Sequence, residues 1–197
     1  MDERDLDPDP LRQFERWFAD AHAVGPAAPE AMTLATATPD GRPSARMVLL
    51  KGADERGLLF FTNRESRKGS ELHANPRAAL LFHWQPPGRQ VRVEGPVERI
   101  SEEESSAYFA GRPLGSRLAA WVSPQSRPLP DRAALERLYA EAADRFPSGE
   151  VPLPTHWGGY RLRPDAYEFW EHGDDRLHDR VRYARGATGW SMTRLAP

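Results

Sequence analysis

Apolar positions near the start of the chain recur at helical spacing. They are three or four residues apart, and they lie between an Asp-Pro pair that can begin a helix and a Gly-Pro pair that can end one. The positions are Leu11, Phe14, Phe18 and Ala21, bounded by Asp9-Pro10 and Gly25-Pro26. The pattern predicts an amphipathic helix that starts at Pro10 and stops before Gly25.

Beyond this helix the pattern changes to short apolar runs separated by turn residues, which is typical of strands. The runs cover residues 32–38, 45–51, 57–62, 78–84, 90–100, 159–162, 166–170, 181–184 and 190–194. Helical patterns interrupt them at 66–74, from a capping box of Ser101 and Glu104, at 118–122 and at 131–146. Strands joined by short turns imply an antiparallel sheet, so we predict a mainly β protein, a barrel with helices packed outside.

Strands and helices do not alternate and no G-x-G-x-x-G is present, which argues against a doubly wound nucleotide fold. The length of 197 residues suits one domain, 1–197. The net charge of −2 argues against a nucleic-acid binder, and no apolar run approaches the ~20 residues of a membrane helix. The acidic first ten residues do not resemble a signal peptide, and there is no cysteine. We therefore expect a cytoplasmic protein.

Lysine is rare among the 27 basic residues, because only Lys51 and Lys68 are lysines. Either two lysines remain by chance, or both positions need a compact point charge of the kind that binds phosphate. Both lysines lie in clusters of polar residues. On a strand, Arg46 and Lys51 would lie on opposite faces and could serve two ligands, or they could be the solvated ends of a barrel strand.

A second cluster begins with Thr62 and continues to Ser66-Arg67-Lys68. A helix that starts near Ser66 would offer free backbone N–H groups to an anion, and the two basic side chains would add charge. The alternative is a solvated helix face. Basic residues are unusual in a first helical turn, which favours the anion site.

Two further groups carry cations. Tyr108 and Arg112 share a predicted helix face near Ser116, which suits an anion but also plain cation–aromatic packing. Arg176, His178 and Arg180 would line one side of an extended segment, either around an anion or as an exposed charged loop. The six histidines show no metal-ligand spacing, so we predict no metal.

Several short motifs follow one another along the chain. They are Arg46-Met-Val-Leu-Leu-Lys51, Phe61-Thr-Asn63 with Ser66-Arg-Lys68, Gly88-Arg-Gln-Val91, Trp121-Val-Ser-Pro-Gln-Ser126, Val151-Pro-Leu-Pro154 with Trp157-Gly-Gly159, Phe169-Trp170, Arg176-Leu-His-Asp-Arg180 and Leu195-Ala-Pro197. Each motif is moderately specific, and their common order is highly specific. Taken in this order, they resemble the pyridoxamine/pyridoxine 5′-phosphate oxidase family from about Asp7 to the end of the chain.

The resemblance implies an FMN-binding split β-barrel that forms a homodimer, with FMN at the interface and a C-terminal dimerisation region of about 150–197. The FMN phosphate and ribityl chain would meet Arg46, Thr62, Arg67, Lys68, Gln125 and Ser126. The rest of the flavin site would comprise Met47, Val48, Leu49, Leu50 and Lys51 along one strand, with Phe61, Gln90, Trp170 and Arg180.

The resemblance also implies a substrate, pyridoxine or pyridoxamine 5′-phosphate, that is oxidised at its 4′ carbon to pyridoxal 5′-phosphate while O2 becomes H2O2. Lys51, Tyr108, Arg112 and Ser116 would bind the substrate phosphate. Arg176, Leu177 and His178 would face the pyridine ring, with Arg176 holding the ring and His178 supporting it as the catalytic pair.

Three features depart from the family. The segment before the first helix is short, Glu171-His172 replaces the commoner Gln-Gly, and Arg117 replaces a usual Gln. Two other functions stay open: an FMN-dependent oxidase of another substrate on this fold, such as a phenazine precursor, or a non-enzymatic binder of flavin or pyridoxal phosphate. The four substrate-phosphate residues, typically lost in the phenazine group, weigh against the first.

Overall fold

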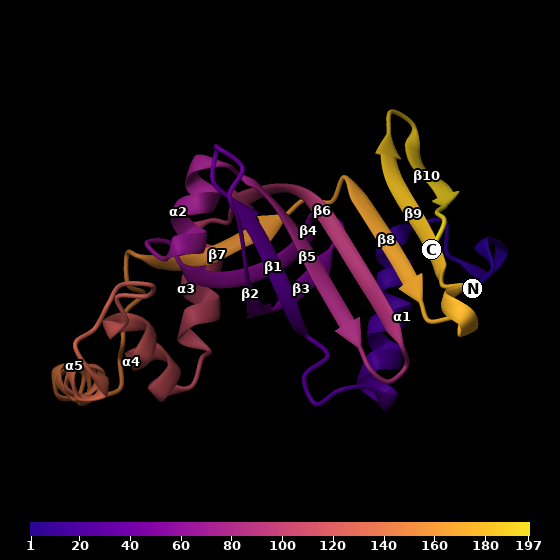
Figure 1. Ribbon diagram of the computed structural model, residues 1–197. Helices are drawn as coiled ribbons and strands as arrows, with labels where there is room; N and C mark the ends of the chain where they lie inside the picture. Colours follow the sequence, from indigo (N-terminus) through magenta and orange to yellow (C-terminus); the bar gives the residue numbers. More distant parts are fainter.

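Ten antiparallel strands form one curled sheet in the computed structural model, which describes residues 1–197 (Figure 1). The strands are β1 Ala31–Ala37, β2 Pro43–Leu49, β3 Gly52–Asp54, β4 Gly57–Asn63, β5 Arg77–Trp84, β6 Arg89–Arg99, β7 Trp157–Leu162, β8 Ala166–Glu171, β9 Asp179–Gly186 and β10 Gly189–Arg194. The helices are α1 Pro10–Val24, α2 Arg67–Ala74, α3 Glu102–Ala110, α4 Leu114–Val122 and α5 Arg132–Arg145, with 3-10 turns η1 Glu3–Asp5 and η2 Asp174–Arg176. The predicted mainly β split barrel with helices outside is confirmed.

Strand β6 is shared by two parts of the sheet. Its first half pairs with β8 and its end pairs with β7, while β5 runs along its other edge. The change of partner occurs at Gly95, where an added Cβ would lie 2.0 Å from the Arg163 carbonyl oxygen. Any side chain at this position would push the two backbones apart, so the close approach requires glycine.

Helix α1 covers one face of the sheet formed by β5, β6 and β8 (Figure 1). Its Phe14 ring lies 5.0 Å from that of Phe82, and its Trp17 ring meets Phe169 edge-on at 5.2 Å.

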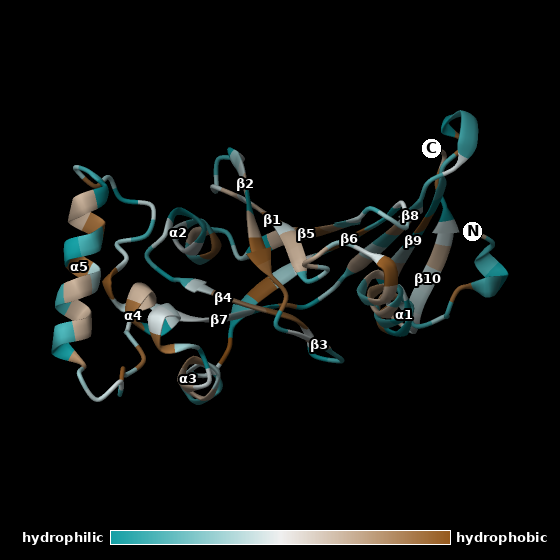
Figure 2. Cartoon of the chain, turned by 90° about the horizontal axis from the view of Figure 1, so that it is seen from below, coloured by the Kyte–Doolittle hydropathy of each residue, from teal (hydrophilic) through white to brown (hydrophobic).

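Figure 2 shows hydrophobic and hydrophilic residues alternating along the exposed helix α5, which lies with α4 at the opposite end of the molecule from α1. A smaller apolar cluster around Phe109 and Trp157 packs beneath these two helices.

Several element predictions need correction. The three-residue strand β3 was missed because it is too short to show a period, and α4 begins at Leu114 rather than at 118. The capping box is only half formed. The Ser101 hydroxyl accepts a hydrogen bond from the Glu104 N–H at 3.0 Å, but the Glu104 carboxylate pairs with Arg56 and Arg161 instead. No helix is long and apolar enough to cross a membrane.

The Tyr160 hydroxyl is buried in the core and has no hydrogen-bond partner. An unpaired buried hydroxyl is costly, so Tyr160→Phe is expected to raise the free energy of unfolding by about 1 kcal/mol. Tyr183→Phe is the matched control, because the Tyr183 hydroxyl donates to the Asp7 carbonyl oxygen at 2.8 Å. That variant should lose about 1 kcal/mol. Urea unfolding of both variants measures the difference, and a destabilised Tyr160→Phe would contradict the expectation.

Candidate functional site

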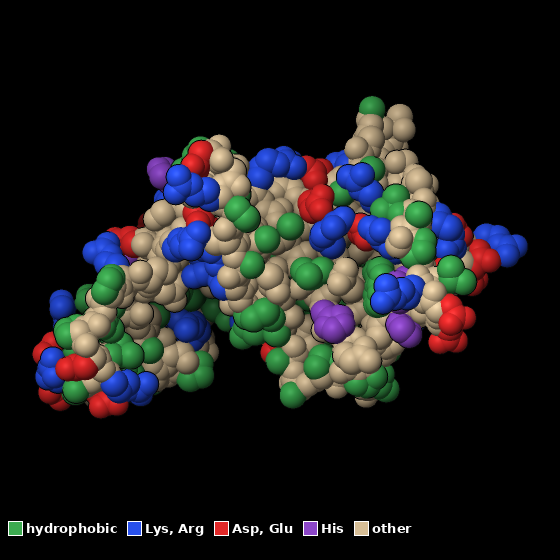
Figure 3. Space-filling view, viewed as in Figure 1, with side chains coloured by type: hydrophobic (Ala, Val, Ile, Leu, Met, Phe, Trp, Pro, Cys, Tyr) green, Lys and Arg blue, Asp and Glu red, His purple; other side chains and the backbone are tan.

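The N-terminus of α2 gathers the residues of the predicted phosphate site. Ser66 caps the helix by accepting the Gly69 N–H, so α2 starts where the sequence predicts. Lys68 is only 8% exposed, and its Nζ donates to Gln125 Oε1 at 2.7 Å. The Arg67 N–H donates to Ser126 Oγ at 3.2 Å, and Thr62 Oγ1 donates to Gln125 Oε1 at 3.4 Å. Helix α2, strand β4 and the loop after α4 therefore meet here, and Lys and Arg side chains gather over α2 (Figure 3).

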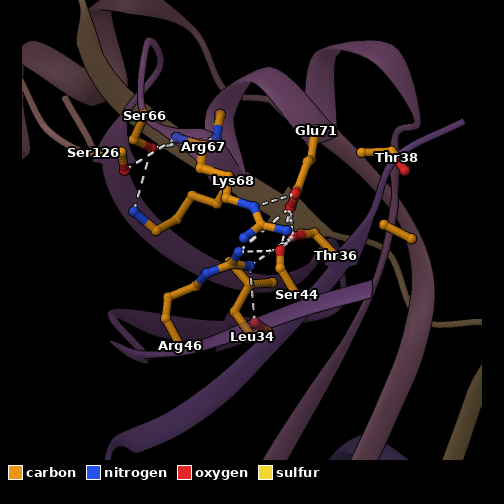
Figure 4. A network of polar contacts seen from close by, with 12 residues as sticks. Leu34, Thr36, Thr38, Ser44, Arg46, Ser66, Arg67, Lys68, Glu71 and Ser126 are labelled. Carbon is orange, nitrogen blue, oxygen red and sulfur yellow. Dashed lines mark hydrogen bonds and ion pairs between the residues drawn. The ribbon is translucent and has the colours of Figure 1, made fainter. Parts of the chain in front are cut away.

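A buried carboxylate, Glu71, holds two of the basic side chains (Figure 4). Its Oε1 accepts from Arg67 Nε at 2.8 Å, and its Oε2 lies 3.4 Å from Arg46 Nη2. The hydroxyls of Thr36 and Ser44 each donate to Oε2 at 2.5 Å. Arg46 also donates from Nη1 to Thr36 Oγ1 at 2.6 Å, so both guanidinium groups are fixed before any ligand binds.

Burial by itself would raise the pKa of Glu71, but hydrogen bonds from Ser44, Thr36 and Arg67 outweigh it and lower this pKa to about 2. The carboxylate is therefore ionised at neutral pH. Three cations and one carboxylate leave two positive charges in the cluster, which matches the ≈ −1.5 to −2 charge of a phosphate monoester. The donor set and its charge thus fit the phosphate group of a ligand such as FMN.

Burial and the neighbouring Arg46 lower the pKa of Lys68 to about 8. Because a bound phosphate favours the ammonium form, binding should be accompanied by proton uptake above this pH, and affinity should fall as pH rises. We expect the Kd for FMN to rise by up to about tenfold per pH unit above pH 8. Titrations between pH 7 and 9 measure this slope. Lys68→Arg is the control, because arginine stays charged; an equally steep slope in this variant would contradict the assignment to Lys68.

Three residues predicted to complete the flavin site lie in one row across three strands. Gln90 on β6 pairs with Trp170 on β8, which pairs with Arg180 on β9. The Trp170 ring lies 4.7 Å from the ring of His178, whose Nδ1 accepts the Gly173 N–H at 3.2 Å. The row links the sheet to the segment that carries the predicted catalytic pair.

The prediction of an extended segment from Arg176 to Arg180 is wrong at its start. Residues Asp174–Arg176 form η2, and Asp175 and Arg176 have φ values of 53° and 64°. The only other non-glycine residue with positive φ is Ser126, at 73°. Such residues cost about 1–3 kcal/mol each and cluster at functional sites. Of these three residues, Ser126 and Arg176 are predicted site residues, and Asp175 directly precedes Arg176.

The predicted substrate-phosphate residues are only partly assembled. Helix α3 ends at Ala110, so Arg112 does not share a helix face with Tyr108, contrary to the prediction. The Arg112 guanidinium lies 4.8 Å from the Trp157 ring, which is the cation–aromatic packing left open above. Burial lowers the pKa of Arg112, and its Nη1 is buried without a partner, which suits an anion. Tyr108 stacks on Phe61 at 3.9 Å.

Ser116 lies near the start of α4, where its N–H donates to the Pro113 carbonyl oxygen. The Lys51 side chain is exposed and forms no hydrogen bond or ion pair with Tyr108, Arg112 or Ser116.

The predicted alternation of side chains between the two faces of the strand from Arg46 to Lys51 is confirmed. Met47 and Leu49 are 62% and 42% exposed, whereas Leu50 is buried.

Two of the departures from the family, Glu171 and His172, lie close to the predicted ring site, whereas Arg117 lies on α4 next to Ser116. Glu171 accepts a hydrogen bond from Arg89 Nε at 2.7 Å, and the His172 ring lies 5.4 Å from that of His178. The Nε of Arg117 is buried without a partner. The sequence interpretation missed the positioning groups Thr36, Ser44 and Glu71. Only the Arg67–Glu71 spacing of four residues on a helix gave a signal that could have found one of them.

Comparisons with known proteins give a consistent result. Residues 18–145 match the family model described as pyridoxamine 5′-phosphate oxidase, and residues 157–197 match the pyridoxine 5′-phosphate oxidase C-terminal dimerisation region. A pyridoxine/pyridoxamine 5′-phosphate oxidase of Rubrobacter xylanophilus is 60% identical over 97% of this chain and 88% of that protein. A pyridoxine/pyridoxamine 5′-phosphate oxidase 1 of Ralstonia nicotianae is 58% identical over 100% and 93%.

Two solved structures have the same fold. PhzG from Burkholderia lata, in complex with tetrahydrophenazine-1-carboxylic acid, has a TM-score of 0.92 and 37% identity over 98% of this chain and 95% of that one. A pyridoxamine 5′-phosphate oxidase-related, FMN binding protein from Nostoc punctiforme has a TM-score of 0.75 and 21% identity over 98% and 100%.

Proposed function

Because this chain belongs to the pyridoxamine 5′-phosphate oxidase family, whose members are oxidoreductases, we propose that it is an FMN-dependent oxidase of pyridoxine and pyridoxamine 5′-phosphates. The product would be pyridoxal 5′-phosphate, with O2 reduced to H2O2; from the amine substrate, water would also be consumed and ammonia released. The observation that carries the proposal is the pre-assembled cluster at the start of α2, which matches a phosphate in charge and donors. In this cluster Arg46 and Arg67 pair with Glu71, and Lys68 is held beside them by Gln125.

In this proposal the FMN phosphate lies against the start of α2, among Arg67, Lys68 and the Ser126 hydroxyl. The flavin ring lies near the row of Gln90, Trp170 and Arg180. Bound FMN would supply the redox chemistry by accepting two electrons from the substrate's 4′ carbon and passing them to O2. The protein's own contribution is to hold both rings in a reactive arrangement.

The substrate phosphate would bind at Arg112, where a buried N–H lacks a partner. Lys51, Tyr108 and Ser116 would complete this second anion site once substrate is present. The assignment gives each of the two lysines one phosphate, Lys68 for FMN and Lys51 for the substrate.

Arg176 and His178 would face the pyridine ring. An arginine does not lose its proton in proteins, so Arg176 can hold the ring and offset developing negative charge, but it cannot act as a base. His178 Nδ1 accepts the Gly173 N–H, which places the proton of the neutral ring on Nε2. His178 can therefore donate a hydrogen bond through Nε2 while its ring packs against Trp170.

We propose a homodimer as the active form. The match of residues 157–197 to a dimerisation region supports it. So do Met47 and Leu49, two predicted site residues that share one face of β2 and are 62% and 42% exposed, because large exposed apolar side chains mark interaction surfaces when they cluster.

The deciding experiment is the visible spectrum of the FMN-loaded protein before and after anaerobic addition of pyridoxine 5′-phosphate. Bleaching of the flavin band, reversed by air with formation of pyridoxal 5′-phosphate, is the expected result. A band that bleaches only with a reduced phenazine carboxylic acid would favour the activity suggested by the likeness to PhzG. A band unchanged by either compound would favour a non-enzymatic binder, and failure to retain FMN would overturn the proposal.

A further inference from the structure

A second row of charged residues lies directly beside the Gln90–Trp170–Arg180 row. In this second row Arg92 on β6 pairs with Glu168 on β8, which pairs with Arg182 on β9. Side chains two residues apart on a strand share a face, so both rows belong to the same face of the sheet. The other face is the apolar core, with Val91 and Phe169 fully buried.

Glu168 is the unusual member of this row, because it is a carboxylate only 4% exposed. Its Oε1 accepts from Arg180 Nε at 3.0 Å and lies 2.9 Å from Arg180 Nη2. Its Oε2 accepts from Arg92 Nη2 at 2.5 Å. Arg92 is held in turn by Glu94, whose Oε1 lies 2.9 Å from Arg92 Nε.

The choice of partner is informative. The register places Arg182 opposite Glu168, yet the carboxylate pairs diagonally with Arg180, while Arg182 remains exposed. Arg180 also donates from Nη1 to the Ala196 carbonyl oxygen at 2.8 Å. An arginine side chain has many rotamers when free. Because Glu168 holds one edge of its guanidinium and the Ala196 carbonyl oxygen holds another, Arg180 keeps a single orientation beside Trp170.

We propose that Glu168 is a positioning residue for the flavin site, which acts by fixing Arg180 in the orientation that meets the isoalloxazine ring. The role of Arg180 in binding flavin rests on the proposed function, whereas the contact between Glu168 and Arg180 does not. A buried carboxylate is costly unless it is paired, so its retention in the middle of this face needs a reason. Preorganisation of the Arg180 side chain is such a reason, because a ligand binds more tightly when the side chain that meets it loses less conformational freedom on binding.

The test compares Glu168→Gln with Glu94→Gln. Both changes remove one negative charge from a contact to Arg92, but only the first removes the partner of Arg180. We expect Glu168→Gln to raise the Kd for FMN by about tenfold or more and to shift the absorption band of bound flavin. Glu94→Gln should change the Kd by less than about twofold, within the range of exposed ion pairs.

A double-mutant cycle separates positioning from a general structural effect. If Glu168 acts through Arg180, adding Glu168→Gln to an Arg180→Gln protein should change the Kd for FMN no further. Additive effects, or a Glu168→Gln protein with wild-type affinity and spectrum, would overturn the proposal. Should Glu168→Gln fail to fold, Glu168→Asp keeps the charge and shortens the reach, and an unchanged Kd in that variant would equally count against it.

A readout without FMN keeps this test independent of the proposed function. The Arg180 Nε–H should give a protected NMR signal in the wild-type protein, assigned by its loss in Arg180→Gln. It should persist in Glu94→Gln and disappear in Glu168→Gln. If the wild-type protein bound no FMN, the proposed function would fail, while this signal would still show whether Glu168 fixes Arg180. A signal that persists in Glu168→Gln would refute the positioning role.

Discussion

Lys68→Ala should raise the Kd for FMN about 100-fold, equivalent to about 3 kcal/mol. The ammonium is almost fully buried against Gln125 and Ser66, where a charge-assisted contact to phosphate is little screened by water. The same burial lowers the pKa of Lys68, which means that the ammonium form is disfavoured in the free site and is stabilised when an anion binds beside it. Quenching of FMN fluorescence on titration with apoprotein measures the change.

Lys51→Ala is the matched control, because Lys51 is the other lysine of the chain and its side chain is exposed. Although the resemblance places Lys51 on the strand that borders the flavin, its side chain does not contact the α2 phosphate cluster, so this variant should bind FMN with nearly wild-type affinity. Its KM for pyridoxine 5′-phosphate should rise about tenfold or more, as expected for loss of one charged contact. If Lys51→Ala instead weakened FMN and left the substrate unaffected, the assignment of one phosphate to each lysine would be wrong.

Arg176→Ala is expected to lower kcat by about 100- to 1,000-fold, the usual loss when one preorganised donor to developing charge is removed. Arg176 is held at a positive φ in η2, and its exposed side chain forms no hydrogen bond or ion pair with the α2 phosphate cluster. The Kd for FMN should therefore change by less than about twofold. Stopped-flow reduction of bound flavin by substrate, with a parallel FMN titration, separates the two quantities.

Arg176→Lys tests the geometry of this group. A lysine keeps the charge but lacks the planar fork, so it should recover only a small part of the lost rate. Full turnover in Arg176→Ala would remove Arg176 from the catalytic pair.

The start of α2 and the two faces of β2 could be predicted from the sequence, because each depends only on residues that are close together along the chain. A serine before two basic residues marks the start of a helix, and α2 begins at that point. The alternation from Arg46 to Lys51 likewise gave the correct faces of β2. These signals lie within a few residues, where backbone geometry alone sets side-chain direction.

The features of the site that could not be predicted from the sequence depend on pairing between segments that are distant along the chain. Glu71 contradicts the simple expectation that a phosphate site is purely cationic, and its partners Thr36 and Ser44 come from two other strands. Glu168 joins Arg92 and Arg180 through a register that no single segment encodes. The left-handed backbone at Arg176 was missed because nothing in Arg or Asp demands it, and only the surrounding contacts can impose it.

Strand β6 also determines the order in which the chain can fold. Its pairing with β5 is a hairpin between near neighbours, but Arg99 must find Tyr160 and Arg89 must find Glu171. Long-range closures of this kind slow folding, since their entropy is lost before the contacts form. The β5–β6 and β9–β10 hairpins can form early, whereas the row that unites Gln90, Trp170 and Arg180 is completed only when β8 docks. Competence to bind flavin should therefore arise late in refolding, after most hairpin structure is present.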